Sequence, residues 1–193
     1  MSYTIEIKDH TLEYLDETHT YLVDGIIVPS ITQLLTMKFG TGYERVPKEV
    51  LYEAARKGTE MHESIERLCK GEKIPATKEI QNFKFLKKMY KFKVLNNEVP
   101  IILFDGETPI AAGRLDMVIE IDGKLGLADL KRTANLDKNR LAYQLNLYRI
   151  GFQQSYGKTV EFLRGIHLRE DTRKFVPVPI NEYLMEEIKC LIQ

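Results

Sequence analysis

The sequence is poor in cysteine, has no long apolar run and carries no net charge. Its 193 residues include two cysteines, Cys69 and Cys190, which are too few for a disulfide framework or for the four thiolates of a typical iron–sulfur cluster. We expect both to be inert thiols in a reducing cytosol. No apolar run approaches about 18 residues and no charged-then-apolar leader is present, so we expect a cytoplasmic protein that does not enter a membrane.

The charge balance limits how an anionic partner is held. The 28 basic and 28 acidic residues cancel, so such a partner requires a local basic patch or a bound metal ion. The chain also lacks a G-x-x-x-x-G-K-[ST] motif, low-complexity segments and internal repeats, which argues against a helicase motor and a repeat fold. At this length, with 44% hydrophobic residues, we expect one domain with one core.

Residues 1–44 differ in pattern from residues 45–193. In the first range, TLEYLDETHTYLVDGIIVPS alternates apolar and polar residues around the turn-forming DET and DG, which predicts short antiparallel strands. Ser30 and Gln33 then have the spacing of a capping box at the start of a short helix. We interpret residues 1–44 as a hairpin-plus-helix attachment and residues 45–193 as the core of a single domain.

The core begins with a helical pattern. Apolar residues recur at three- and four-residue steps from Pro47 to Gly71, and Gly58 either breaks this run into two helices or permits a close backbone approach. A second helix is predicted within residues 77–95, with an apolar side made of Ile80, Phe83, Leu86, Tyr90 and Val94. Another side of this helix carries a lysine stripe, which consists of Lys84, Lys87, Lys88 and Lys91.

Strands and helices alternate in the rest of the chain. The pattern predicts strands at 98–104, 110–121 and 124–130, a helix at 138–156, strands near 160–168 and 174–178, and a helix from Asn181. Asp122-Gly123, between the second and third strands, is a strong signal for a two-residue hairpin. The order predicts an α/β or α+β fold with a central mixed sheet flanked by helices.

The hairpin brings two carboxylates together. If Asp122 and Gly123 form the loop, Ile121 pairs with Lys124, and counting back along both strands places Asp116 opposite Asp129. Side chains alternate between the faces of a strand, so Lys131 shares the face of Asp129 and lies opposite Arg114. The other face of the second strand is then predicted to carry Leu115, Met117, Ile119 and Ile121.

Directly opposed carboxylates need a compensating charge. Their β-carbons lie about 5 Å apart, where the repulsion is about 3 kcal/mol at an effective dielectric near 20. A shared proton, a cation such as Lys131 or Arg114, or a divalent metal ion would each offset this repulsion. A metal ion on carboxylates polarises a phosphoryl oxygen and lowers the pKa of bound water, which suits phosphodiester hydrolysis. The ordinary alternative for an isolated D-x-K is a surface salt bridge.

Four motifs together resemble a known family. GRLDMV (Gly113 to Val118), DLK (Asp129 to Lys131) and QLNLY (Gln144 to Tyr148) are similar to the G-x-x-D, D/E-x-K and Q-x-x-x-Y series of the RecB-like branch of the PD-(D/E)XK nuclease superfamily. KGTEMHESIE (Lys57 to Glu66) resembles the helical histidine motif of the same branch. The resemblance implies a restriction-endonuclease-like αβββαβ core.

The resemblance also implies roles for matching positions. Asp116 and Asp129 would hold Mg²⁺ or Mn²⁺, Lys131 would act on the attacking water, and the main-chain carbonyl of Leu130 and the ring of His62 would be further metal ligands. A hydrogen bond from His62 to Glu66 is the ordinary alternative for that histidine. Gln144 and Tyr148 lie on one helix face and would reach this site or the DNA beside it, although spacing alone favours a core position for Tyr148. No iron–sulfur cluster is expected, because the cysteines that hold one in several relatives are missing.

A surface for DNA is predicted on the second helix. The lysine stripe is the best candidate for phosphate contacts, and a solvated helix face is its alternative. Phe85, Tyr90 and Phe92 lie among these lysines and would either stack on unpaired bases or belong to the core. Glu98, at the start of the first core strand, is either a supporting residue of the metal site or an exposed strand-end charge.

The sequence therefore predicts a metal-dependent DNA nuclease. An exonuclease acting at single-stranded or free DNA ends is favoured, because HTYLVDGIIVPSITQLL resembles segments that precede the core in small phage and mitochondrial exonucleases of this branch. Such an enzyme would work in recombination, repair or replication in the cytoplasm of a bacterial or phage-infected cell. The resemblance also allows a recombination or replication protein as a partner. The alternatives are a structure-specific or nicking endonuclease of the same superfamily and a non-catalytic DNA-binding protein on a nuclease scaffold.

Overall fold

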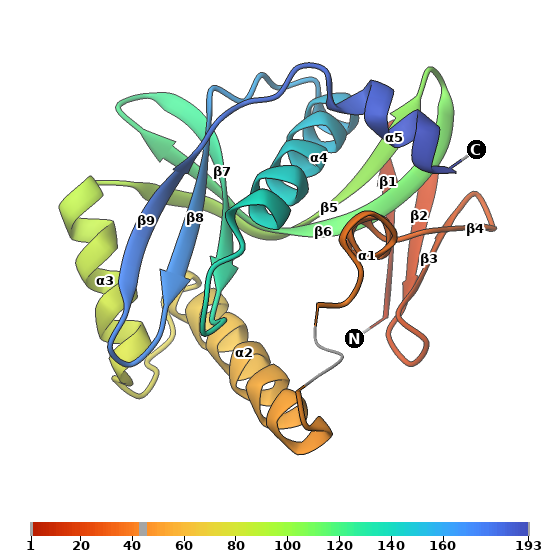
Figure 1. Cartoon of the computed structure of the whole chain (residues 1–193). Helices are drawn as coiled ribbons and strands as arrows, with labels where there is room; N and C mark the ends of the chain where they lie inside the picture. The colour runs from red at the N-terminus through yellow and green to blue at the C-terminus, as the bar shows by residue number, and fades with distance from the viewer. Residues whose placement is uncertain (1, 43–45, 193) are drawn as a thin grey trace.

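Two sheets organise the chain in the computed structural model, which describes residues 2–42 and 46–192 (Figure 1). The smaller sheet is an antiparallel meander of β1 (Tyr3–Ile7), β2 (His10–Leu15), β3 (Thr20–Val23) and β4 (Ile26–Val28). The helix α1 (Ile31–Phe39) follows, and the predicted capping box at Ser30 and Gln33 is present. The N-terminal part thus has four strands where the sequence predicted a hairpin. The predicted boundary at residues 44 and 45, and the side chain of Cys190, lie outside the described residues.

The larger sheet is mixed, as predicted. Its five strands are, in spatial order, β5 (Lys93–Asp105), β6 (Thr108–Ile121), β7 (Lys124–Lys131), β8 (Phe162–Leu168) and β9 (Arg173–Val178). All neighbours are antiparallel except β7 and β8, which are parallel. The crossover between these two strands is α4 (Lys138–Tyr156), whose bounds match the prediction.

Helices cover both faces of this sheet. On one face, α4, α1 and α5 (Leu184–Ile192) pack with Ile101, Leu115 and Leu127 of the strands in the larger apolar cluster. On the other face, α2 (Lys48–Cys69) and α3 (Lys78–Tyr90) pack with Met117, Ile119 and other strand residues in a second cluster. Figure 1 shows α4 crossing the sheet and α2 extending away from it. The fold is therefore of the mixed α+β class with a helix-flanked central sheet.

The predicted register of the β6–β7 hairpin is confirmed. Ile121 pairs with Lys124, and the pairing continues in step to Met117 and Ala128. Asp122 and Gly123 have φ values of 50° and 77°, the left-handed conformation that a type I′ turn requires at both positions. Backbone pairing stops one step before Asp116 and Asp129, so these two residues lie at the open end of the ladder.

The predicted placement of Leu115 is wrong. Met117 and Ile119 share one face as predicted, where they pack with α2 and α3, but Leu115 packs with α4 on the opposite face. The alternation of side chains along β6 is therefore shifted by one residue at Asp116. Next to this point, Glu98 of β5 has φ 51°, and it is the one non-glycine residue with positive φ inside a described strand. Glu98 lies opposite Asp116, between the pairs Asn97–Met117 and Val99–Leu115, so the backbone of β5 is distorted where the alternation of β6 fails.

Two further predictions, on the role of Gly58 in α2 and on the end of α3, are wrong. The helix α2 runs unbroken through Gly58, and a Cβ built there would meet nothing within 4 Å, so neither predicted role of this glycine is found. The helix α3 ends before residue 95, because Lys91 adopts the left-handed conformation at its C-cap. The chain then turns inward, which buries Phe92 and stacks its ring on Phe175.

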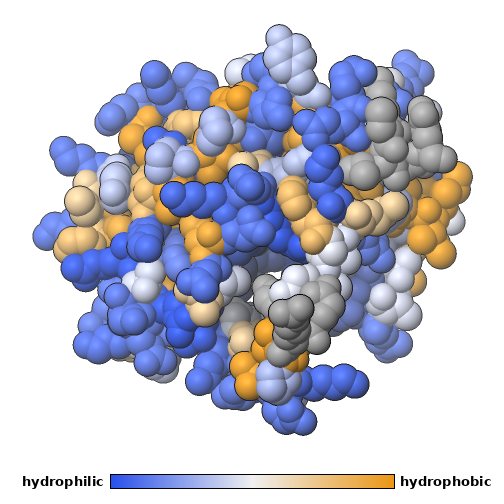
Figure 2. All heavy atoms as spheres, viewed as in Figure 1, coloured by the Kyte–Doolittle hydropathy of each residue, from blue (hydrophilic) through white to orange (hydrophobic). Residues whose placement is uncertain are grey.

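The surface is largely hydrophilic in the view of Figure 2. An apolar group in this view lies over β4, where Ile26 and Ile27 are each 70% exposed. None of the helices in the described ranges has both the length and the apolar character needed to span a bilayer.

Two glycine-to-alanine substitutions test the fold. Gly58→Ala should raise the free energy of unfolding by about 0.5–1 kcal/mol, because α2 is helical there and the added methyl group meets open space. Gly113→Ala should lower it by about 1–3 kcal/mol through overpacking, because its Cβ would lie 2.9 Å from Ile31 Cγ1 and 3.0 Å from Tyr148 Cε1. Urea denaturation measures both changes, and the opposite order of stabilities would contradict this placement.

Candidate functional site

A cleft of about 800 Å³ opens at the end of the β6–β7 ladder. Residues of β2, β3 and the first turn of α1 line one side, and residues of α2 from Gly58 to Glu66 line another. Between them lie the predicted catalytic residues of β6 and β7, Asp116, Asp129 and Lys131. The N-terminal sheet, α2 and the predicted catalytic residues therefore line one cavity.

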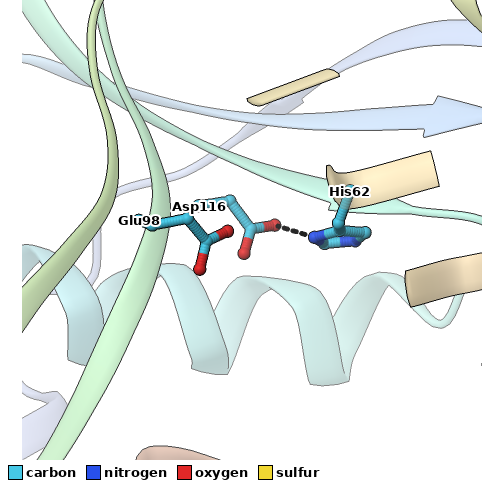
Figure 3. Close-up of side chains that lie close together, drawn as sticks. All are labelled: His62, Glu98 and Asp116. Atoms are coloured by element: carbon cyan, nitrogen blue, oxygen red, sulfur yellow. Dashed lines mark ion pairs between the residues drawn. The ribbon is translucent and has the colours of Figure 1, made fainter. Parts of the chain in front are cut away.

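Three potential metal ligands gather in this cleft. His62 of α2, Glu98 of β5 and Asp116 of β6 each offer one ligand atom, and these atoms all lie within 4.8 Å of one another. Figure 3 shows the carboxylates of Glu98 and Asp116 side by side, with the His62 ring next to Asp116. The separation between His62 Nδ1 and Asp116 Oδ2 is 3.7 Å. Two of these residues were predicted ligands, and Glu98 was predicted to be either a supporting residue or an exposed strand-end charge.

Leu130 fixes the orientation of two of these ligands. Its amide donates to Asp116 Oδ2 at 2.6 Å, and its carbonyl oxygen lies 3.1 Å from His62 Nε2. If Nε2 carries the ring proton and donates it to this carbonyl, Nδ1 keeps its lone pair and faces Asp116. In this arrangement the Leu130 carbonyl positions His62, whereas the resemblance implied that it contacts the metal directly.

Asp129 is buried beside Lys131. Its side chain is 1% exposed, and Oδ2 lies 2.6 Å from Lys131 Nζ. Neither carboxylate oxygen has an oriented hydrogen-bond donor among the described residues. Burial raises the pKa of Asp129 to about 6; the Lys131 ammonium opposes this change and the Asp116 carboxylate adds to it. Burial alone would lower the pKa of Lys131, but the Asp129 and Asp116 carboxylates outweigh it and raise that pKa.

Glu98 is held in a strained and charged position. Its left-handed backbone costs about 1 kcal/mol or more in a strand, a cost typical of functional sites. Burial, followed by the nearby Asp116 carboxylate, raises the pKa of Glu98 to about 7. Arg114 opposes this increase, since its Nε lies 2.5 Å from Glu98 Oε2. A carboxylate buried among other carboxylates in this way favours a cation nearby.

This set of side chains fits a divalent metal ion. Glu98 and Asp116 supply hard oxygen donors, and the His62 ring nitrogen is a ligand that Mn²⁺ also accepts. The two buried oxygens of Asp129 without an oriented donor add negative charge beside the group. Asp129, which was also a predicted ligand, is not one of the three residues that lie within 4.8 Å of one another, and its carboxylate contacts Lys131. The site thus has a three-residue ligand group with an adjacent carboxylate–ammonium pair.

Gln144 and Tyr148 also line the cleft, and Tyr148 belongs at the same time to the larger apolar cluster. Burial raises the pKa of Tyr148 well above its usual value, and the charges of Asp116 and Asp129 add to this effect. The tyrosine therefore stays protonated and can donate a hydrogen bond into the site. Gly113 makes room for its ring on β6, because a Cβ there would lie 3.0 Å from Tyr148 Cε1.

The lysine stripe of α3 lies elsewhere. Its four side chains are exposed, and none of them lines the cleft. Of the aromatic residues beside it, Phe92 is buried in the core, whereas Phe85 is 45% exposed and lies under the guanidinium of Arg173 at 3.8 Å. The structure therefore does not join this stripe to the residues around Asp116.

The apo protein should lose stability as the pH rises. Asp129 and Glu98 have folded-state pKa values raised to about 6 and about 7, above the usual 3.8 and 4.5. Their contribution to stability is complete below about pH 4 and is lost as the pH rises through the folded-state values. Differential scanning calorimetry with a chelator measures this loss. Excess Mn²⁺ should raise Tm more at about pH 7.5 than at about pH 5.5, because the metal ligands must be deprotonated. Equal increases in Tm at the two pH values would contradict metal binding by these carboxylates.

Glu98→Gln should weaken Mn²⁺ binding by about tenfold or more, because one ligand oxygen of the group loses its charge. Isothermal titration calorimetry without nucleic acid measures this change. Glu120→Gln is the matched control, since Glu120 pairs with Lys93 at 2.9 Å across the same two strands but outside the cleft. Similar affinities in both variants would exclude Glu98 from the ligand group.

Comparisons with known proteins give no family for this chain. No protein-family model matches it, and neither does any curated protein. Among solved structures, the crystal structure of SSO0001 is similar at 17% sequence identity and a TM-score of 0.46, over 86% of this chain and 77% of that chain. A similarity of this size carries no conclusion about activity or ligands.

Proposed function

We propose that the protein is a divalent-metal-dependent nuclease that hydrolyses phosphodiester bonds in DNA. The observation that carries this proposal is the gathering of His62, Glu98 and Asp116 next to the Asp129–Lys131 pair in one open cleft. Ligands for a hard cation beside an ammonium group suit phosphodiester hydrolysis. The site's motifs also resemble those of RecB-like PD-(D/E)XK nucleases.

The order of elements supports a restriction-endonuclease-like core. From α3 to β8 the chain reads helix, three antiparallel strands, helix and parallel strand, which is the αβββαβ order that the resemblance implies. The ligands lie on the middle strands and on the preceding helix α2, while Gln144 and Tyr148 lie on the crossover helix α4. This order of elements and this placement of residues support the proposed nuclease fold.

Each residue of the site has a role in the proposed reaction. His62, Glu98 and Asp116 would hold the metal ion, with Asp129 as the adjacent carboxylate. When bound, the ion supplies polarisation of a phosphoryl oxygen and a lower pKa for water. Lys131, kept protonated by Asp129, orients the attacking water and stabilises negative charge that develops on the phosphate. Gln144 and Tyr148 donate hydrogen bonds to the substrate from the same cleft.

We propose an exonuclease acting at DNA ends, on the resemblance of the N-terminal segment to those of small exonucleases. DNA is therefore the expected partner. The test uses linear single- and double-stranded DNA labelled at either end, with closed circular DNA as the discriminating substrate.

Linear DNA should be degraded with Mg²⁺ or Mn²⁺ and not with a chelator. Asp116→Ala, Asp129→Ala and Lys131→Ala should each lower the rate by about a thousandfold or more, because each removes a charged group of the reacting site. Lys124→Ala is the matched control, since Lys124 is exposed at the other end of β7. Circular dichroism checks that all variants fold.

Three outcomes separate the candidates. Cleavage of closed circular DNA would favour the endonuclease over the exonuclease. Tight DNA binding without cleavage under any divalent metal ion would favour a non-catalytic binder. Full activity in Asp129→Ala would refute the proposed chemistry.

A further inference from the structure

Arg114 lies between the ligand group and the N-terminal sheet. It precedes Asp116 by two residues on β6 and lines the cleft, where its side chain is 39% exposed. Its Nε contacts Glu98 Oε2 at 2.5 Å, and its guanidinium carbon lies 5.7 Å from the ring centre of Tyr14 in β2. One contact orients the guanidinium along its edge, and the other supports its face.

The terminal nitrogens of Arg114 are open to the cleft. A guanidinium has five N–H donors, and the ion pair with Glu98 lies on its Nε side. Within residues 2–42 and 46–192, Nη1 and Nη2 have no hydrogen-bond acceptor. The other two basic side chains of the cleft are engaged: Lys131 with Asp129, and Arg132, 13% exposed, with Glu79 and Glu170.

The charge of the cleft favours such a donor. With the carboxylates ionised and the histidines neutral, three lysine and arginine side chains face five carboxylates, which are those of Glu63, Glu66, Glu98, Asp116 and Asp129. The formal charge is therefore negative and repels a nucleic-acid phosphate, so a divalent cation and a cationic donor would each favour its binding. Arg114 is the cleft cation whose terminal donors remain open.

We propose that Arg114 binds a phosphodiester oxygen of the substrate through its two terminal nitrogens, while its Nε holds Glu98 in the ligand group. This inference rests on the proposed nuclease function and names the part of the substrate that the cleft recognises. A planar guanidinium is suited to bidentate contact with phosphate, which a lysine cannot reproduce. The contact is to the backbone, so binding is independent of base sequence.

The test measures nucleic-acid binding without turnover. A fluorescent single-stranded oligonucleotide of mixed sequence is titrated with protein by anisotropy, with Ca²⁺ in place of Mg²⁺, over a series of KCl concentrations. Arg114→Ala should raise Kd about tenfold and reduce the slope of log Kd against log salt by about one phosphate contact. Arg114→Lys should keep the wild-type slope, since it keeps the charge, but bind more weakly than wild type.

The matched control is Arg67→Ala. Arg67 makes an ion pair of the same kind, with Nε 2.6 Å from Glu72 Oε2, on α2 outside the cleft. It should bind the oligonucleotide as wild type does. Thermal denaturation of each variant checks folding. If Arg114→Ala does not fold, the decisive measurement is the binding of Arg114→Lys, which should be weaker than that of the wild type with the same salt slope.

The outcomes separate this inference from the proposed function. If the wild type cleaves DNA while Arg114→Ala keeps its Kd and salt slope, the role of Arg114 is refuted and the nuclease stands. If the wild type binds DNA without cleaving it while Arg114→Ala loses affinity and slope, the nuclease is refuted and the phosphate contact stands. A loss equal to that of Arg67→Ala would show only a general effect of charge and would also refute the contact.

Discussion

The hydrogen bond from the Leu130 amide to Asp116 Oδ2 is the contact on which the site depends. It lies where backbone pairing between β6 and β7 stops, so a side chain replaces the carbonyl that would otherwise accept from this amide. The carbonyl of the same residue meets His62 from α2. One residue of β7 thus aligns ligands from two other elements, and its two neighbours, Asp129 and Lys131, form the adjacent charged pair.

The end of the ladder also allows charged side chains to be buried next to the apolar core. Two apolar clusters cover the two faces of the sheet, and the alternation of β6 side chains between them is shifted at Asp116. Glu98 adopts its left-handed backbone beside this point, so both carboxylates project into the cleft. Burial raises the pKa of Glu98 and of Asp129, which means that the folded apo protein disfavours their charge. A divalent cation would remove this penalty, which couples metal binding to stability.

The sequence was sufficient for the part of the site that depends on local rules. The Asp122-Gly123 turn fixes the hairpin register, and this alone brings Asp116 and Asp129 to the same end of two strands. Glu98 could not be placed in the same way. From the turn after Asp105, simple counting sets Glu98 opposite Leu115, but a register shift between Leu103 and Phe104 moves the pairing by one residue. Such shifts depend on tertiary packing and leave little trace in a single sequence.

The same limit applies to the N-terminal sheet, which the sequence suggested was only an attachment. Its core cluster includes Ile102 and Phe104 of β5 and Ala112 of β6, so the two sheets share an apolar interface. The Ala112 amide donates to the Pro29 carbonyl at 3.0 Å, two residues from Arg114. The contact with Tyr14 then supports the guanidinium itself. Because these contacts hold the strand that carries Arg114, the position of the cleft's open cationic donor depends on a sheet that contributes none of the metal-ligand group.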